Sequence, residues 1–295
     1  MNARTKRKWK DQAWAYLFIG PQVLGLLCFI VGPVLFSFMI SFMQWDLGAK
    51  PEWIGLSNYS KQLSDPTFWK VLNNTTLFAI LNIPLTVIGA LLLAIMLNQN
   101  IRGKVLFRAA FFIPAVTSSV AVALVWTWLY NPNFGLINSA LSSIGIQGPG
   151  WLSDLKWALP SIVIMTVWQG LGYNMILFLA GLQGVPSHLY EAAKIDGAGG
   201  WQRFWKITLP MISPTTFFVV IMLLIGSMQI FSEPYMMTKG GPADATNVLV
   251  LYIFNTAFQF FRMGEASAIS FVLFLIIFII TLVQFKFSKW VNYDV

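Results

Sequence analysis

Six long stretches without a single charged residue constrain the fold of this chain most strongly. Each is at least 20 residues long: 12–45, 71–101, 109–153, 157–190, 207–232 and 266–285. A helix needs about 20 mostly apolar residues to cross a bilayer. We therefore predict an all-α membrane protein with six transmembrane helices, near 14–41, 72–97, 108–130, 160–183, 210–232 and 266–286. The composition agrees, since 57% of residues are hydrophobic and only 10% are charged.

The distribution of Lys and Arg predicts the orientation. With a cytoplasmic N-terminus, the inner segments carry thirteen of these residues and the outer segments carry six. Because cytoplasmic loops are enriched in Lys and Arg, we expect both termini to be cytoplasmic. The net charge of +8 then reflects topology, and the basic residues are too scattered to indicate a nucleic-acid partner.

The domain organisation follows from the same pattern. Residues 1–13 form a basic cytoplasmic N-terminus, and the apolar run after it is longer than the roughly 7–15 residues of a signal-peptide core. We predict one transmembrane domain over 14–290, with its core at 70–286 and a cytoplasmic loop at 184–209. Membrane lipid is therefore an expected partner.

The loop 184–209 divides into two expected helical pieces. Ser187 can cap a short helix from about His188 to Asp196, and Gly197 should stop this helix in a sharp turn. A compact knob of this kind can dock into a partner, although many membrane proteins have an ordinary amphipathic loop at such a place. The second piece has an aromatic stripe that should lie on the membrane interface or on the bundle. The stripe consists of Trp201, Phe204, Trp205 and Thr208.

The spacing of residues in this loop resembles that of a known family. Its pattern is E-A-A-x-x-x-G followed by I-x-L-P, formed by Glu191, Ala192, Ala193, Gly197, Ile207, Leu209 and Pro210. This resembles the carbohydrate-type ABC importer permeases, which serve maltose, lactose, oligosaccharide and glycerol-3-phosphate uptake. The outer segments Asn131–Asn138 and Gly240–Pro242 also look like those of the family, whereas the short first outer loop departs from maltose-type subunits with extra spans.

The resemblance implies the type I ABC importer permease fold in the cytoplasmic (inner) membrane of a prokaryote. It implies a heteromeric complex that contains a second related permease, a dimer of ATP-binding subunits and an extracytoplasmic solute-binding protein. The EAA motif would act as the coupling helix in a cleft of the ATP-binding subunit. Its ATPase-coupling residues would be Glu191, Ala192, Ala193, Asp196 and Gly197.

The energy source is expected to lie outside this chain. The phosphate-loop pattern G-x-x-x-x-G-K-[ST] and metal-ligand spacings of His, Cys, Asp or Glu are missing from the sequence. We therefore expect no enzyme activity and no cofactor in this chain, with ATP and Mg bound by the partner ATPase. An ion-coupled secondary transporter commonly has ionisable residues within its spans. Here every Asp, Glu, Lys and Arg falls at or beyond the ends of the predicted spans, although backbone carbonyls can coordinate Na⁺. A membrane enzyme acting on lipid-linked substrates would need a polar catalytic cluster, and none is visible.

Polar residues near the centre of the fourth and fifth spans are candidates for a cargo path. The candidates are Thr166, Gln169, Gly170, Tyr173, Asn174, Ser227 and Gln229, with Asn82 as a weaker one. The alternative is that they only hydrogen-bond helix to helix. Together with the resemblance, these polar residues favour import of a sugar or oligosaccharide by alternating access. The same machine could instead carry glycerol phosphates or another polar solute. Glu233 at the mouth of the fifth span would repel an anionic solute and so favours neutral sugars over glycerol phosphates.

Overall fold

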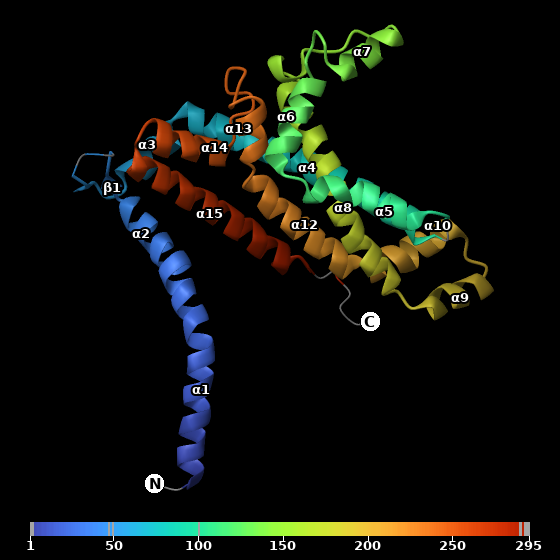
Figure 1. Cartoon of the computed structure of the whole chain (residues 1–295), viewed down its shortest axis with the longest axis horizontal. Helices are drawn as coiled ribbons and strands as arrows, with labels where there is room; N and C mark the ends of the chain where they lie inside the picture. Colours follow the sequence, from blue (N-terminus) through green and yellow to red (C-terminus); the bar gives the residue numbers. More distant parts are fainter. Residues whose placement is uncertain (1–2, 47, 49, 100, 289–290, 292–295) are drawn as a thin grey trace. The chain divides into compact units, whose positions relative to one another are not determined.

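The computed structural model of the chain describes residues 3–46, 48, 50–99, 101–288 and 291, and most of these are helical. Figure 1 shows the elements in chain order. The α-helices are α1 (Ala3–Leu26), α2 (Gly32–Ile40), α3 (Ser57–Ser64), α4 (Pro66–Asn98), α5 (Lys104–Val116), α6 (Ser119–Leu129), α7 (Leu136–Ser143), α8 (Ala158–Gln183), α9 (Ser187–Ile195), α10 (Gly200–Arg203), α11 (Leu209–Met211), α12 (Ser213–Met228), α13 (Ser232–Met237), α14 (Leu249–Phe254) and α15 (Met263–Lys286). Shorter elements complete the chain: the π-helices η1 (Leu27–Val31), η3 (Phe204–Thr208) and η4 (Asn255–Gln259), the 3-10 helix η2 (Trp151–Ser153), and strands β1 (Met43–Gln44) and β2 (Glu52–Trp53).

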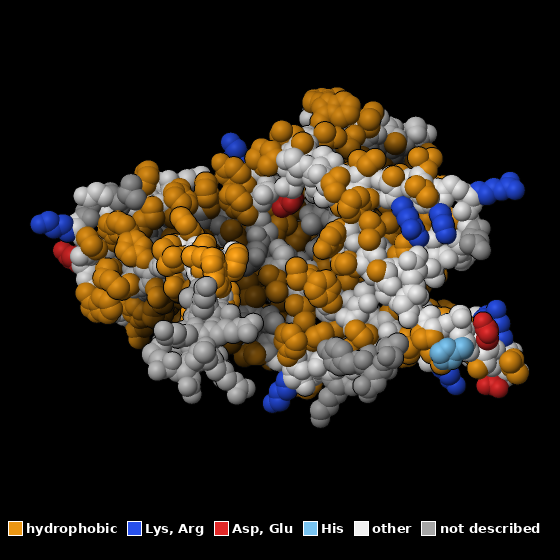
Figure 2. Space-filling view, turned by 60° about the horizontal axis from the view of Figure 1, so that its bottom comes forward, with side chains coloured by type: hydrophobic (Ala, Val, Ile, Leu, Met, Phe, Trp, Pro, Cys, Tyr) orange, Lys and Arg blue, Asp and Glu red, His pale blue; other side chains and the backbone are white. Residues whose placement is uncertain are grey.

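Four continuous helices in the described residues are long and apolar enough to cross a membrane. They are Trp14–Ile40, Pro66–Asn98, Ala158–Gln183 and Met263–Lys286. Two further candidates are bent pairs of helices, so the number of spans reaches six if each pair is one span. Many large apolar side chains are exposed, and hydrophobic groups cover much of the face in Figure 2. Such a surface suits a multi-pass membrane protein.

The third predicted span is not one straight helix. α5 ends at Val116, α6 begins at Ser119, and the two helices meet at 98°. Pro114 lies just before the break, and a proline leaves the carbonyl four residues earlier without its helical N–H partner. The amide of Gln169 in α8 donates to the Thr117 carbonyl at 3.2 Å. A neighbouring side chain therefore satisfies a backbone group exposed by the break, as a helix interrupted in a membrane requires.

The expected second piece of the cytoplasmic loop is also interrupted. The stripe Trp201 to Thr208 was predicted on one α-helix, but the π-helix η3 falls within it and shifts the helical period. Trp201 is 74% exposed whereas Thr208 is 8% exposed, so the stripe does not share one environment. A further bend of 65° separates Gly200–Met211 from Ser213–Met228.

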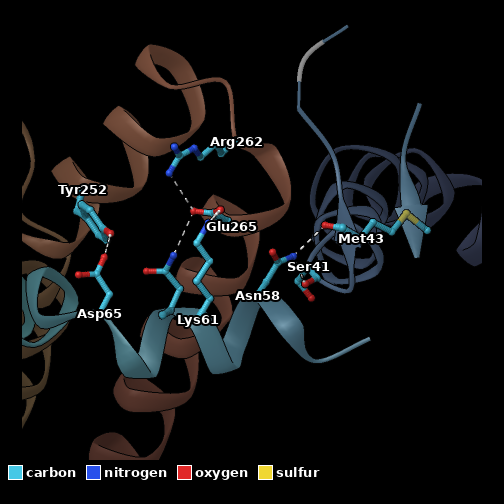
Figure 3. A network of polar contacts seen from close by, with 9 residues as sticks. Ser41, Met43, Asn58, Lys61, Asp65, Tyr252, Arg262 and Glu265 are labelled. Carbon is cyan, nitrogen blue, oxygen red and sulfur yellow. Dashed lines mark hydrogen bonds and ion pairs between the residues drawn. The ribbon is translucent and has the colours of Figure 1, made fainter. Parts of the chain in front are cut away.

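The chain divides into two compact units. The first unit comprises Met1–Ser64 with Ile253–Val272 and includes the antiparallel pair β1–β2, an addition to the predicted all-α fold. In Figure 3, Asn58 donates to the carbonyls of Ser41 and Met43, each at 2.9 Å. Lys61 and Glu265 form an ion pair nearby. These bonds join segments of the first unit that are far apart in the sequence.

The second unit comprises Asp65–Tyr252 with Leu273–Val295. Its long helix α4 begins where Asp65 accepts from the Thr67 N–H at 2.8 Å and Pro66 occupies the first turn, both typical helix starts. Asp65 also accepts from the Tyr252 hydroxyl at 3.2 Å (Figure 3). α8 contacts α4, α5 and α12, and lies at the centre of this unit.

Close packing around α8 depends on a small residue. A Cβ at Gly172 would overlap the Phe111 carbonyl of α5, whereas a Cβ at Gly170 would have 3.7 Å to its nearest neighbour. Small residues of this kind let membrane helices approach closely. Gly172 therefore fixes the α5–α8 contact, which places the polar residues of α8 relative to the other helices.

Candidate functional site

The first candidate site is the exposed helix α9, which carries the predicted coupling residues. None of its side chains is buried within the described part of the chain, and Ile195 is 87% exposed. Figure 2 shows acidic and basic side chains gathered around the single histidine, His188, which marks this loop. α9 is joined to α8 by a lead of three residues after Gln183. It is a charged helical knob whose surface is left free by the fold of this unit.

The ends of α9 correct one expectation and confirm another. Ser187 is not the N-cap: the helix starts at Ser187, Pro186 occupies the cap position, and no side chain caps the helix. The C-terminus is stopped by Gly197, as predicted, with a φ of +78°. The Gly197 N–H donates to the Lys194 carbonyl at 3.1 Å and the Ala198 N–H to the Ala193 carbonyl at 2.8 Å. This is the Schellman arrangement, in which a residue at left-handed φ closes the helix.

One side-chain bond connects this knob to Gly200–Met211, the first part of the second bent pair. The hydroxyls of Tyr190 in α9 and Thr208 in η3 lie 2.9 Å apart. Tyr190 and Thr208 both line a cavity of about 410 Å³, whose lining also includes Arg203 and Asn98. α9 is thus attached to α8 and α10 by short connecting segments, and to η3 by the Tyr190–Thr208 contact, rather than by an apolar core.

The second candidate site is a cavity of about 330 Å³ between α4, α8 and the end of α12. Its lining residues are Phe78, Asn82, Thr166, Met222, Leu223, Gly226, Ser227, Gln229, Ile230, Phe231, Ser232 and Glu233. Apolar and neutral polar residues line it together with Glu233, and small-molecule sites likewise combine apolar surface with placed polar groups. Three residues predicted for the cargo path, Thr166, Ser227 and Gln229, come together here.

The polar groups of the cavity are organised by Asn82. Its amide donates to the Ser227 hydroxyl at 3.0 Å, and its carbonyl oxygen accepts from the Thr86 hydroxyl at 3.3 Å. Asn82 is 4% exposed and Ser227 3% exposed. From the sequence, Asn82 is the weaker cargo candidate, with a helix-to-helix hydrogen bond as the alternative. Here it both joins α4 to α12 and lines the cavity.

The other predicted cargo residues of α8 do not line this cavity. Gln169 bonds to the α5–α6 break, and the Asn174 amide donates to the Gly170 carbonyl at 2.9 Å. Tyr173 is 50% exposed. Because α8 is packed against α4, α5 and α12, neighbouring polar positions on it face different partners.

Glu233 closes one side of the cavity from the first turn of α13, beyond the end of α12. Burial raises the pKa of its carboxyl, while a hydrogen bond from its own backbone N–H lowers it by less. Elsewhere in the described residues, no group of three or more His, Cys, Asp or Glu could hold a metal ion.

Comparison with known structures identifies the fold. The fold matches a chain of a bacterial ABC transporter involved in the import of the acidic polysaccharide alginate, with a TM-score of 0.86 and 24% identity. The match covers 97% of this chain and 98% of that chain. The two chains therefore share one fold.

Sequence comparison then gives the family. Residues 86–293 match the binding-protein-dependent transport system inner membrane component family, to which this chain belongs. The lactose transport system permease protein LacF of Rhizobium radiobacter is 37% identical, over 96% of each chain. The trehalose/maltose transport system permease protein MalF of Thermococcus litoralis is 35% identical, over 98% of each chain. The resemblance to carbohydrate-type permeases is confirmed.

Proposed function

We propose that this chain is the permease subunit of an ATP-driven importer for a sugar or oligosaccharide. It would cross the inner membrane of a prokaryote six times, with each bent pair of helices as one span and both termini in the cytoplasm. It would work with a second related permease, a dimer of ATP-binding subunits and an extracytoplasmic solute-binding protein. ATP and Mg would be bound by the ATPase partner. The sugar class is supported by relatives named for lactose and for trehalose and maltose.

The observation that carries this proposal is the exposure of α9. A helix of nine residues without a buried side chain gains little from its own unit, because most helical stability in proteins comes from packing of one face. Its C-terminal cap and the short segments on either side would transmit a displacement of α9 by a partner to α8 and to the helices α10–α12. The proposed mechanism is alternating access, in which closure of the ATPase dimer moves α9 and opens the cavity outward.

The test is co-purification from the native membrane in mild detergent. The tagged wild-type chain should bring down a related permease and an ATP-binding subunit. Glu191→Lys should lose the ATP-binding subunit and keep the permease, because it reverses one charge on the docking face. Glu52→Lys on the exposed strand β2 makes the same change outside the predicted coupling motif and should keep both partners. A wild-type chain that purifies alone and transports without ATP would contradict the proposal.

A further inference from the structure

The charge of the described cavity lining comes from one residue. Among its described lining residues, Glu233 is the one with an ionisable side chain, and the others are apolar or neutral polar groups. No basic side chain stands among them to compensate a carboxylate. Any solute in this space therefore meets the negative charge of Glu233 without a positive charge in the lining to offset it.

The neutral polar groups of the lining carry no net charge that could offset the carboxylate. Asn82 and Ser227 bond to each other, and Asn82 accepts from Thr86 as well. The Thr166 hydroxyl donates to the Ile162 carbonyl of its own helix at 2.9 Å. Part of the donor capacity of these groups is thus already engaged within the protein. A carboxylate, by contrast, only accepts hydrogen bonds and so matches solutes that present O–H or N–H groups.

Burial strengthens the influence of Glu233. Its side chain is half-buried beside Phe231 and the α12 terminus, where solvent screens charge less than at an open surface. Phe78 and Phe231 provide apolar surface on the same cavity, which suits the apolar faces of a ring-shaped polyol. The arrangement combines one carboxylate, which repels anions, with apolar surface and neutral polar groups.

We propose that Glu233 is a specificity-determining residue that makes this cavity admit neutral or basic polyhydroxy solutes and exclude anionic ones. This inference rests on the proposed function, since it assumes that the cavity belongs to the cargo path. It narrows the cargo to uncharged or amino-bearing sugars, and it disfavours sugar acids and phosphorylated polyols. The carboxyl of Glu233 accepts hydrogen bonds from cargo hydroxyl or ammonium groups.

The test uses two thiol reagents of similar size and opposite charge, on the complete transporter in proteoliposomes. They are the cationic trimethylammonium-ethyl and the anionic sulfonato-ethyl methanethiosulfonates. Cys28→Ser removes the single native cysteine of this chain, and Gln229→Cys places a thiol in the cavity. The measured quantity is the ratio of the cationic to the anionic labelling rate on this chain, with Glu233 and with Glu233→Gln.

Glu233→Gln keeps the size of the side chain and removes the charge, so the rate ratio at Gln229→Cys should fall by about fivefold or more. The matched control is Ser139→Cys on the exposed helix α7, which does not line the cavity; its ratio should not change. An unchanged ratio at Gln229→Cys would overturn the role of Glu233 and leave the cargo path standing. If neither reagent labels Gln229→Cys during ATP-driven cycling, the cavity is not on a solute path, and the proposed function of the cavity fails as well.

Discussion

The knob α9 and the cavity at the end of α12 are built in opposite ways. α9 has no buried side chain, and its backbone bonds are closed by its own cap. The cavity is organised by the nearly buried pair Asn82 and Ser227. An exposed helix is free of packing constraints, so a strict residue pattern there indicates a partner. Buried polar groups can serve packing and cargo at once, so only matched variants separate the two roles.

Packing around the cavity can be separated from cargo contact with two glycines on α8. Gly172→Ala should prevent folding, because the added Cβ would overlap the Phe111 carbonyl and backbone cannot yield as a side chain can. Gly170→Ala should be tolerated, since its Cβ would sit 3.7 Å from Thr86. Yield and size-exclusion profiles in detergent measure both. Equal, normal profiles for the two variants would contradict the described α5–α8 contact.

The cap of α9 should control coupling without affecting folding of the bundle. Gly197 has a φ of +78° and open space around it, so Gly197→Val meets conformational strain and no clash. A β-carbon at left-handed φ costs about 1–2 kcal/mol. ATP-driven uptake in proteoliposomes should fall by about tenfold or more, while insertion stays normal.

Gly197→Asn is the control for the cap, since Asn adopts the left-handed conformation more readily. It should retain most of the uptake. If Gly197→Val and Gly197→Asn transport equally well, the cap geometry of α9 is not required for coupling.

The bond between Asn82 and Ser227 should contribute modestly to stability. Side-chain hydrogen bonds between membrane helices are worth about 0.6 kcal/mol on average and up to about 1.7 kcal/mol. A double-mutant cycle with Asn82→Ala and Ser227→Ala, measured by thermal unfolding in detergent, should give a coupling energy in that range. A coupling energy near zero would mean that the two groups are available to cargo rather than to each other.

The smallest effect is expected for Tyr190→Phe, which removes the hydroxyl that lies 2.9 Å from that of Thr208. A single hydrogen bond contributes about 0.5–1.5 kcal/mol, so uptake should change by less than about tenfold. Complete loss of uptake, measured in the same proteoliposomes as Gly197→Val, would show that this bond, rather than the cap and leads, connects α9 to the bundle.

The sequence predicted the features that depend on local composition. Charge-free windows located the apolar helices, and the glycine at position 197 located the end of α9. A kink near Pro114 could be expected from the sequence, since a proline in a membrane helix favours one. The full breaks beside Thr117 and Ile212 were not predicted, because the bend angles of 98° and 65° depend on packing against other helices. The cavity escaped prediction for a related reason. Its lining comes from α4, α8 and the α12–α13 turn, and their pairing depends on packing rather than on spacing along the chain.

The most direct test of the account is to identify what α9 touches in the native membrane. A photoreactive p-benzoylphenylalanine in place of Ile195, which is 87% exposed, should cross-link to an ATP-binding subunit upon irradiation. The same residue in place of Ser139 on α7 should not. Cross-links from α9 to lipid alone, with no nucleotide-binding protein attached, would contradict the coupling role.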